Sequence, residues 1–246
     1  MTNPTPSATG LTMQPIGHIE SDFPDKFGVP RQPGLASVAH AELILVSPYD
    51  DPLAVRGLDA FSHLWLTFVF HHSPERWTPL VRPPRLGGNA KVGVFASRST
   101  HRPNRLGLSL VELLEIDTSH GVRLVLGGCD LVSGTPVLDI KPYLPWVEAR
   151  TDARAGYAPE APSLLEVRFS DAAEAVLAAR SDGTSLRELI RQVLAQDPRP
   201  AYRNGAEERV YGVRLRDIDV RFQAMEDASR NIVLRVVDIV SPSPEA

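Results

Sequence analysis

The first 150 residues contain no long amphipathic helix, and this constrains the fold more than any other feature of the sequence. Short runs rich in branched and aromatic side chains recur there instead, separated by Pro, Gly, Asn and Asp. Parallel strands need long crossover connections, which are usually helical, so this spacing predicts antiparallel pairing. We therefore expect an antiparallel barrel or closed sheet and not a doubly wound fold.

Seven runs are predicted as strands. The run 63–70 is apolar on both faces over most of its length, which is typical of a central strand that is covered on each side. The predicted strands are 14–20, 41–46, 63–70, 91–96, 108–116, 122–126 and 135–140.

The sequence changes character after about residue 150, where a polar stretch, 148–161, predicts a linker. A strand (164–169), an Ala-rich helix (172–179), a second helix (185–195) and three strands (210–215, 218–222, 232–240) are predicted beyond it. The second helix is expected to begin with a capping box of Ser185 and Glu188, and its apolar residues follow a 3.6-residue period. The chain is thus predicted to be mainly β, with a disordered tail (1–12), a single-sheet antiparallel β-barrel (13–150) and a smaller α+β domain (151–246).

Composition excludes several classes of protein. A single cysteine, Cys129, forms neither an internal disulfide nor a thiolate metal site, and it indicates a reducing cytoplasm. No apolar run approaches the roughly 20 residues of a membrane helix. The seven histidines show no metal-binding spacing, and the usual nucleotide and serine-hydrolase motifs are absent, so neither a metal nor a Rossmann cofactor site is expected.

Charge is unevenly distributed along the chain. The net charge of −4 argues at face value against a nucleic-acid partner. However, the segment 75–110 carries seven basic residues and one acid, and no acid occurs from Arg76 to Arg105. This segment predicts an affinity for RNA that weakens as salt is added.

Two segments of the barrel half combine charged side chains with turn residues. In 95–109, Arg98, Arg102 and Arg105 flank a turn with Asn104, which suits an anion or an RNA backbone; the alternative is a plain hairpin turn with Arg98 paired to a carboxylate. In 130–143, Asp139, Lys141 and Tyr143 follow one another at the end of a strand, either as a functional cluster or as a structural ion pair.

Two further loops are equipped for binding. Prolines fix the backbone around Arg31 and Gln32, which makes either a binding loop or only a rigid one. In 197–203, Tyr202 offers a stacking face, and Arg199 and Arg203 offer donors to phosphate.

Together these segments resemble the TrmO family of tRNA methyltransferases, which use S-adenosylmethionine on a β-barrel. The resemblance covers about residues 13–222. It rests on Pro15-Ile-Gly-His-Ile19, Pro30-Arg-Gln32, Phe61-Ser-His-Leu-Trp65, Phe70-His71, Arg98-Ser99, Arg102-Pro-Asn104, Asp139-Ile-Lys-Pro-Tyr143 and Asp197-Pro-Arg-Pro200.

The resemblance implies transfer of a methyl group to N6 of N6-threonylcarbamoyladenosine, next to the anticodon at tRNA position 37. It also implies a homodimer, with the cofactor held by the N-terminal barrel. By this resemblance the residues expected at the cofactor are Pro30, Arg31, Gln32, His71, His72, Arg98, Leu110, Asp130, Leu131 and Val132.

The chemistry suggests roles for the remaining residues. Methyl transfer depends on alignment, and the acceptor nitrogen benefits from losing its proton to a base. We expect Tyr143 to contact the reacting base, Asp139 to accept the proton or to organise the site, and Lys141 to tune both. Arg102 and Arg199 are the candidate receptors of the threonyl carboxylate, and the other expected substrate contacts are Asn104, Tyr202 and Arg203. Two alternatives stay open: methylation of another acceptor, and a module that binds S-adenosylmethionine without catalysis.

Overall fold

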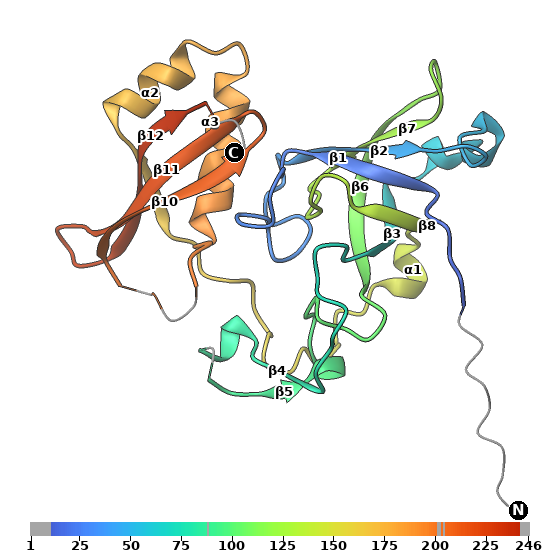
Figure 1. The fold of residues 1–246 in the computed structure, drawn as a ribbon, viewed down its shortest axis with the longest axis horizontal. Helices are drawn as coiled ribbons and strands as arrows, with labels where there is room; N and C mark the ends of the chain where they lie inside the picture. Colours follow the sequence, from blue (N-terminus) through green and yellow to red (C-terminus); the bar gives the residue numbers. More distant parts are fainter. Residues whose placement is uncertain (1–10, 88, 201–202, 204, 242–246) are drawn as a thin grey trace, which may run out of the picture.

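The computed structural model describes residues 11–87, 89–200, 203 and 205–241. Within them the N-terminal half forms a closed barrel and the C-terminal half a separate four-stranded sheet with helices, which confirms the predicted fold class. Figure 1 shows the two halves side by side, with the barrel strands β1, β2, β3, β6, β7 and β8 in one half and α2, α3 and β10–β12 in the other.

The barrel has six antiparallel strands in the order β1-β2-β7-β6-β3-β8, and β8 pairs back with β1 to close it. Buried and partly exposed residues alternate along β3, so Leu64, Leu66 and Phe68 face the core. The strands are β1 (Gly17–Ser21), β2 (His40–Leu45), β3 (His63–Val69), β6 (Leu106–Asp117), β7 (Arg123–Gly127) and β8 (Pro136–Pro142).

The predicted strand 91–96 does not belong to the barrel. Only β5 (Val92–Gly93) is extended there, it pairs with β4 (Leu80–Val81), and a 3-10 turn (Val94–Ala96) follows. The six strands of the closed barrel already pair their backbone hydrogen-bonding groups with one another, so this apolar run forms a separate small hairpin. Three other 3-10 turns, Pro52–Val55, Leu58–Ala60 and Pro84–Leu86, and the helix α1 (Pro145–Glu148) complete the N-terminal half.

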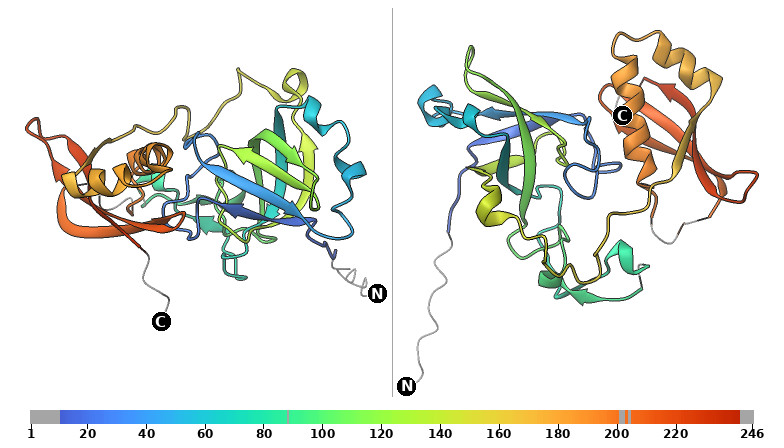
Figure 2. Two further views of the ribbon diagram at one scale, coloured as in Figure 1. Left: turned by 90° about the horizontal axis from the view of Figure 1, so that it is seen from above. Right: turned by 180° about the vertical axis from the view of Figure 1, so that it is seen from behind.

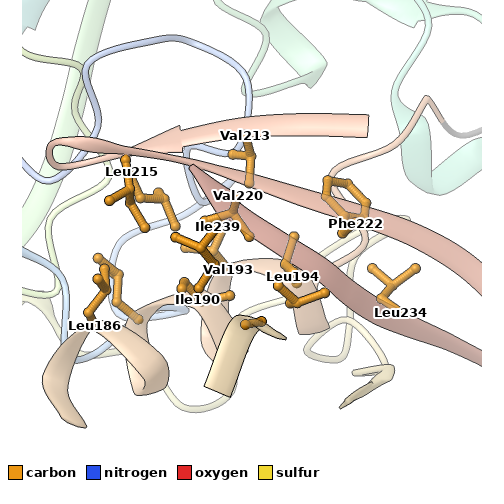
Figure 3. Close-up of a cluster of buried hydrophobic side chains, with 14 of the residues drawn as sticks. Leu186, Ile190, Val193, Leu194, Val213, Leu215, Val220, Phe222, Leu234 and Ile239 are labelled. Atoms are coloured by element: carbon orange, nitrogen blue, oxygen red, sulfur yellow. The ribbon is translucent and has the colours of Figure 1, made fainter. Parts of the chain in front are cut away.

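The C-terminal sheet has the order β10-β11-β12-β9, in which β9 runs parallel to β12. Two helices pack against it, and Figure 3 shows apolar side chains of α3 lying against side chains of the strands. The elements are β9 (Glu166–Phe169), α2 (Asp171–Ala178), α3 (Gly183–Ala195), β10 (Glu207–Leu215), β11 (Ile218–Glu226) and β12 (Ile232–Val240).

The capping box predicted for α3 is wrong. The helix begins at Gly183, two residues before Ser185, and the side chain of its N-cap residue Asp182 accepts no capping bond. That carboxylate is held by Arg180 and Arg216, while Glu188 binds Arg191. The ion pairs therefore replace the side-chain cap.

The connection between β1 and β2 belongs to both halves. Phe23, Ala36 and Ala39 are buried in the same hydrophobic cluster as α3 and the C-terminal strands. An ion pair reinforces this contact, because Arg216 Nε donates to Asp22 Oδ1 at 2.8 Å. The barrel and the C-terminal sheet thus share side chains, although the linker separates them in sequence.

Gly107 on β6 provides a test of how tightly the barrel is packed. A Cβ atom at this position would lie 2.3 Å from the Phe68 ring on β3, so Gly107→Ala should destabilise the protein by about 2 kcal/mol. Chemical denaturation measures this change. Gly93→Ala is the control, because no neighbouring atom lies within 4 Å of its added Cβ. Equal stability of the two variants would contradict the packing argument.

Candidate functional site

Three chain connections meet at one end of the barrel, where β1, β3 and β7 finish and β2, β6 and β8 begin. We call this the loop end. Its connections are residues 22–39, 70–105 and 128–135. Nine of the ten expected cofactor residues lie on them, and they come from all three: Pro30, Arg31 and Gln32; His71, His72 and Arg98; and Asp130, Leu131 and Val132.

Backbone contacts hold two of these connections together. Gly34 N–H donates to the Gly128 carbonyl at 2.8 Å, and Gly128 N–H donates to the Ala39 carbonyl at 2.9 Å. Gly128 has φ +63°, and a Cβ atom added to it would lie 3.3 Å from Gly34 Cα, so glycine permits both the turn and the close approach. The hydroxyl of Ser21 adds a bond of 2.7 Å to the Leu131 carbonyl.

Asp130 is the most strongly perturbed acid of the loop end. Desolvation raises its pKa to about 6, against the opposing effects of the Ser109 hydroxyl and the positive charge of Arg98. Ser109 Oγ donates to Asp130 Oδ1 at 2.7 Å from inside the barrel wall. Among the described residues no carboxylate oxygen lies within 4 Å of the Arg98 guanidinium. The structure therefore does not contain the structural ion pair that was the alternative role of Arg98.

His71 and His72 follow β3 with their ring centroids 3.9 Å apart. Partial burial lowers the pKa of His71, and the neighbouring His72 lowers it further, so His71 is neutral at pH 7. A Cβ atom at Gly134 would lie 3.9 Å from His71 Nε2, which places His71 against the third connection, 128–135. The loop end thus combines a carboxylate and a neutral imidazole with an exposed guanidinium from Arg31.

The three expected catalytic residues lie elsewhere on the barrel. Asp139 and Lys141 are exposed on its outer face, where they pair with Thr67 and Trp65 of β3. Tyr143 N–H donates to the His63 carbonyl, and its ring meets the Trp65 ring edge-on at 6.1 Å. Because seven residues of β3 span about 20 Å, Tyr143 and the loop end lie at opposite ends of the strand. One chain therefore does not bring Tyr143 to the expected cofactor residues.

Leu110, the tenth expected cofactor residue, also lies on this outer face, on β6 opposite Trp65. Arg102 and Asn104 belong to the second connection. Arg102 Nη1 donates to the carbonyls of Val94 and Ser97, so this arginine braces the turn before it. Within the described residues its Nε and Nη2 groups have no hydrogen-bond partner.

A groove of about 650 Å³ lies on the C-terminal half, and Arg31 of the loop end borders it. Arg31 lines it from the barrel, Arg199 and Arg203 line it from the loop after α3, and the segments 162–166 and 231–233 complete its walls. The structure therefore brings one expected cofactor residue next to two expected substrate residues, although they are far apart in the sequence.

Arg199 has a different role from the expected one. Its side chain is fully buried and binds Asp197 with two hydrogen bonds of 2.8 and 2.9 Å, and it also donates to the Gly205 carbonyl. Glu207 lies 3.4 Å from it and also accepts from Arg203 and Tyr211. With its donors engaged in this way Arg199 holds the loop in place, so the structure gives it a structural role, and the expected contact with a substrate carboxylate stays a prediction. Tyr202 lies outside the described residues.

Ser109 and the groove walls formed by 162–166 and 231–233 were not singled out from the sequence. Ser109 is a polar residue on the inward face of β6, between the buried Gly107 and Val111. A hydroxyl on an otherwise apolar face is a recognisable signal for a buried acceptor nearby. Among the described residues no group of three or more His, Cys, Asp or Glu could hold a metal, and no helix is long and apolar enough to cross a bilayer.

Comparison with known families identifies this arrangement. The family model for the tRNA-methyltransferase O N-terminal domain matches residues 18–149, and the model for the TrmO C-terminal domain matches residues 162–239. The chain belongs to the TrmO family. The TrmO models thus match the barrel and the C-terminal sheet as two consecutive segments.

Individual TrmO relatives are similar over almost the whole chain. A tRNA (adenine(37)-N6)-methyltransferase from Escherichia coli (strain K12) is 53% identical over 223 residues, which are 89% of this chain and 95% of the relative. A Pseudomonas aeruginosa protein named "Putative S-adenosylmethionine-dependent methyltransferase RcsF" is 48% identical over 93% of this chain and 97% of its own. The crystal structure of TrmO from Pseudomonas aeruginosa superimposes with a TM-score of 0.77 at 40% identity, covering 96% of this chain and 100% of that chain.

The raised pKa of Asp130 predicts a pH-dependent stability. An acid whose pKa is higher in the folded state stabilises the fold most when it is protonated, so this stability falls as the pH rises from about 4 to about 6. Asp130→Asn cannot ionise. Relative to the wild type it should therefore gain on the order of 2 kcal/mol between pH 4 and pH 7. Urea denaturation at several pH values measures the difference.

Ser109→Ala is the companion variant. It removes a hydrogen bond that lowers the pKa of Asp130, so the fall in stability should extend to higher pH than in the wild type. A stability difference between wild type and Asp130→Asn that stays constant from pH 4 to pH 7 would refute this description of Asp130.

Proposed function

We propose that this protein is an S-adenosylmethionine-dependent methyltransferase that acts on N6 of adenosine 37 in tRNA, and that its acceptor is the N6-threonylcarbamoyl form of that base. The observation that carries the proposal is the meeting of three connections at the loop end, next to a groove on the C-terminal half. Membership of the TrmO family supports the same reaction, because the Escherichia coli relative is named for it.

The donor groups of the loop end fit S-adenosylmethionine. When bound, this cofactor supplies a methyl group that is activated by a positive sulfonium. Asp130 is a carboxylate that can accept from a hydroxyl or an ammonium group, and Arg31 is an exposed cation that can receive a carboxylate. The main-chain groups around Leu131 and Val132 and the ring of His71 can border an adenine.

The substrate has a carboxylate on its threonyl group, and the groove offers cations to receive it. Arg31 lines the groove from the loop end. Arg203 lines it too, but its guanidinium is ion-paired with Glu207. Arg102 keeps Nε and Nη2 available among the described residues, so it is the second candidate. Arg31 and Arg102 thus replace Arg199, whose guanidinium is occupied. A tRNA substrate and the buried free thiol of Cys129 both fit a cytoplasmic protein.

Proton removal from the acceptor nitrogen needs a base at the loop end. Asp139 and Tyr143, with Lys141 between them, are the candidates, yet Tyr143 lies at the other end of β3 in the same chain. A second copy, packed with its strands running the opposite way, would place its Tyr143 end beside the first copy's loop end. Two-fold symmetry would then form two identical shared sites.

The outer face of β3 and β6 has the surface that such a homodimer needs. Leu108 and Leu114 on β6 are exposed, and Trp146 on α1 is 80% exposed. Exposed apolar side chains that gather on one face indicate an interface. The same face contains Asp139 and Lys141, so burying it between two copies would place these groups near both sites.

Mass spectrometry of tRNA nucleosides tests the proposed reaction. After incubation of the protein with S-adenosylmethionine and threonylcarbamoylated tRNA, we expect threonylcarbamoyladenosine to gain the mass of one methyl group, whereas unmodified tRNA should gain nothing. Tyr143→Phe should lower the rate by a factor on the order of 10²–10⁴ with unchanged cofactor affinity, if the phenol acts on the proton.

Other outcomes of the same assay point to the alternatives. Methylation of the unmodified tRNA, or of a different base, would replace the proposed acceptor. Cofactor binding in calorimetry without any methylated nucleoside would favour a module that binds S-adenosylmethionine without catalysis, and it would refute the proposal.

Mixed dimers test whether the site is shared. Arg31→Ala and Tyr143→Phe should each be inactive alone, but a one-to-one mixture refolded together should recover about a quarter of the wild-type activity. In the mixed dimer, one site combines the intact Arg31 of one copy with the intact Tyr143 of the other. A mixture as inactive as its components would show that each site lies within one chain.

A further inference from the structure

The arginines of this protein differ in ion pairing from one segment to another. Among the described residues of the C-terminal half, nine arginines form ion pairs with Asp or Glu, including Arg168, Arg187 and Arg191. Between Arg76 and Arg105 the described residues form no ion pair, and the sequence has no acid there that could form one locally. The positive charge of the segment 76–105 is therefore not neutralised by ion pairs within the described part of the protein.

Some of these unpaired cations have structural roles. Arg102 and Arg105 donate to main-chain carbonyls, and Arg85 Nη1 donates to the Glu160 carbonyl of the linker at 2.6 Å. Arg98 acts on Asp130 through its charge. Arg76, Arg82 and Lys91 are left: all three are exposed, and they have no hydrogen bond or ion pair among the described residues.

These three cations lie on one projecting feature. Residues 76–87 and 89–95 form a small arm around the β4–β5 hairpin, which a bond from Val94 N–H to the Pro79 carbonyl closes at 2.9 Å. Both Figure 1 and the right-hand view of Figure 2 show β4 and β5 apart from the barrel strands, near the linker. The bond from Arg85 to Glu160 fixes the arm to that linker.

The arm also exposes aromatic rings. Trp77 is 43% exposed and Phe95 is 74% exposed, and Arg102 approaches the face of the Phe95 ring at 5.9 Å. Exposed aromatic rings among unpaired cations are typical of surfaces that bind single-stranded RNA, where bases stack on the rings and phosphates meet the cations. A protein partner with an acidic surface would explain the cations but not the two rings.

We infer that this arm is a tRNA-binding element, in which Arg76, Arg82 and Lys91 contact phosphates and Trp77 and Phe95 stack on unpaired bases of the anticodon loop. The inference rests on the proposed function, because it assigns a binding surface for that tRNA. It also explains how a chain with a net charge of −4 can bind an anionic polymer, because the arm is locally basic whatever the sum of charges over the whole chain.

A charge variant with a matched control tests the phosphate contacts. Binding of fluorescein-labelled threonylcarbamoylated tRNA is measured by anisotropy over a range of salt concentrations, with the triple variant Arg76→Gln, Arg82→Gln, Lys91→Gln. We expect the slope of log K against log salt to fall by about 2 to 3, and Kd to rise on the order of 10- to 100-fold near 0.15 M salt.

The control triple variant, Arg168→Gln, Arg187→Gln, Arg191→Gln, changes the net charge by the same amount in the C-terminal half. It should change the slope by less than one, since these arginines are paired with glutamates. Equal loss of tRNA affinity in both triple variants would overturn the inference, because total charge and not the arm would then govern binding.

Substitution of the two aromatic rings should affect tRNA binding differently from substitution of the cations. Trp77→Leu and Phe95→Leu should each weaken binding about tenfold without changing the salt slope, and Trp77→Phe should retain most of the affinity. Thermal melting and calorimetry with S-adenosylmethionine show whether each variant keeps its fold and its loop end.

The outcomes also separate the inference from the proposed function. A wild type that methylates tRNA while all arm variants bind like the wild type would overturn the inference alone. A wild type that binds tRNA through the arm but methylates no nucleoside would overturn the proposed function alone. A wild type that does not bind tRNA at all overturns both.

Discussion

The ion pair between Asp22 and Arg216 joins the barrel to the C-terminal half. Asp22 directly follows β1, and its carboxylate accepts from His40 N–H at the start of β2 as well as from Arg216 Nε, both at 2.8 Å. Arg216 occupies the tight turn between β10 and β11 with φ 52°, and its N–H donates to the Asp22 carbonyl. Its Nη1 also reaches Asp182, the N-cap of α3. One guanidinium therefore aligns a barrel strand pair, a sheet turn and a helix, and the loss of its charge would leave the buried Asp22 carboxylate uncompensated.

Asp182, a second carboxylate of this network, has a strongly lowered pKa. Hydrogen bonds from Arg180, and then from Arg216, hold the pKa of Asp182 at about 2 despite some desolvation. An acid whose pKa is lowered in the folded state contributes its full stabilisation above about pH 4 and loses it as the pH falls toward 2. Asp130 behaves in the opposite way, because burial without a close cation raises its pKa. The protein thus keeps its structural carboxylates charged and leaves one carboxylate at the loop end that takes up a proton in mild acid.

The sequence predicts the six barrel strands well, because alternating apolar residues and turn residues are local signals. The run 91–96 has the same local signals, so its place outside the barrel depends on closure by other strands, which a single segment does not encode. The structural role of Arg199 is not a local signal either: its partner Asp197 is only two residues away, but the burial of the guanidinium depends on the packing of the C-terminal half. The opposite positions of Tyr143 and His71 follow from strand direction once β3 and β8 are known to pair. The groove beside Arg31 depends on how two halves meet, which no local pattern contains.

The β1–β2 connection belongs to the N-terminal half by sequence but packs in the hydrophobic core of the C-terminal half. By chain order the segment between α1 and β9 is the natural place to divide the protein, yet Gly28 lies so close to Val213 that a Cβ there would be 2.2 Å from its methyl group. Removing the C-terminal half would expose Phe23, Ala36 and Ala39 to water and leave the segment around Arg31 without support. Recombination at the linker would therefore produce chimaeras whose barrels lose the shape of their own loop end. A change of packing in the C-terminal half would therefore be felt at Arg31 through this one barrel loop.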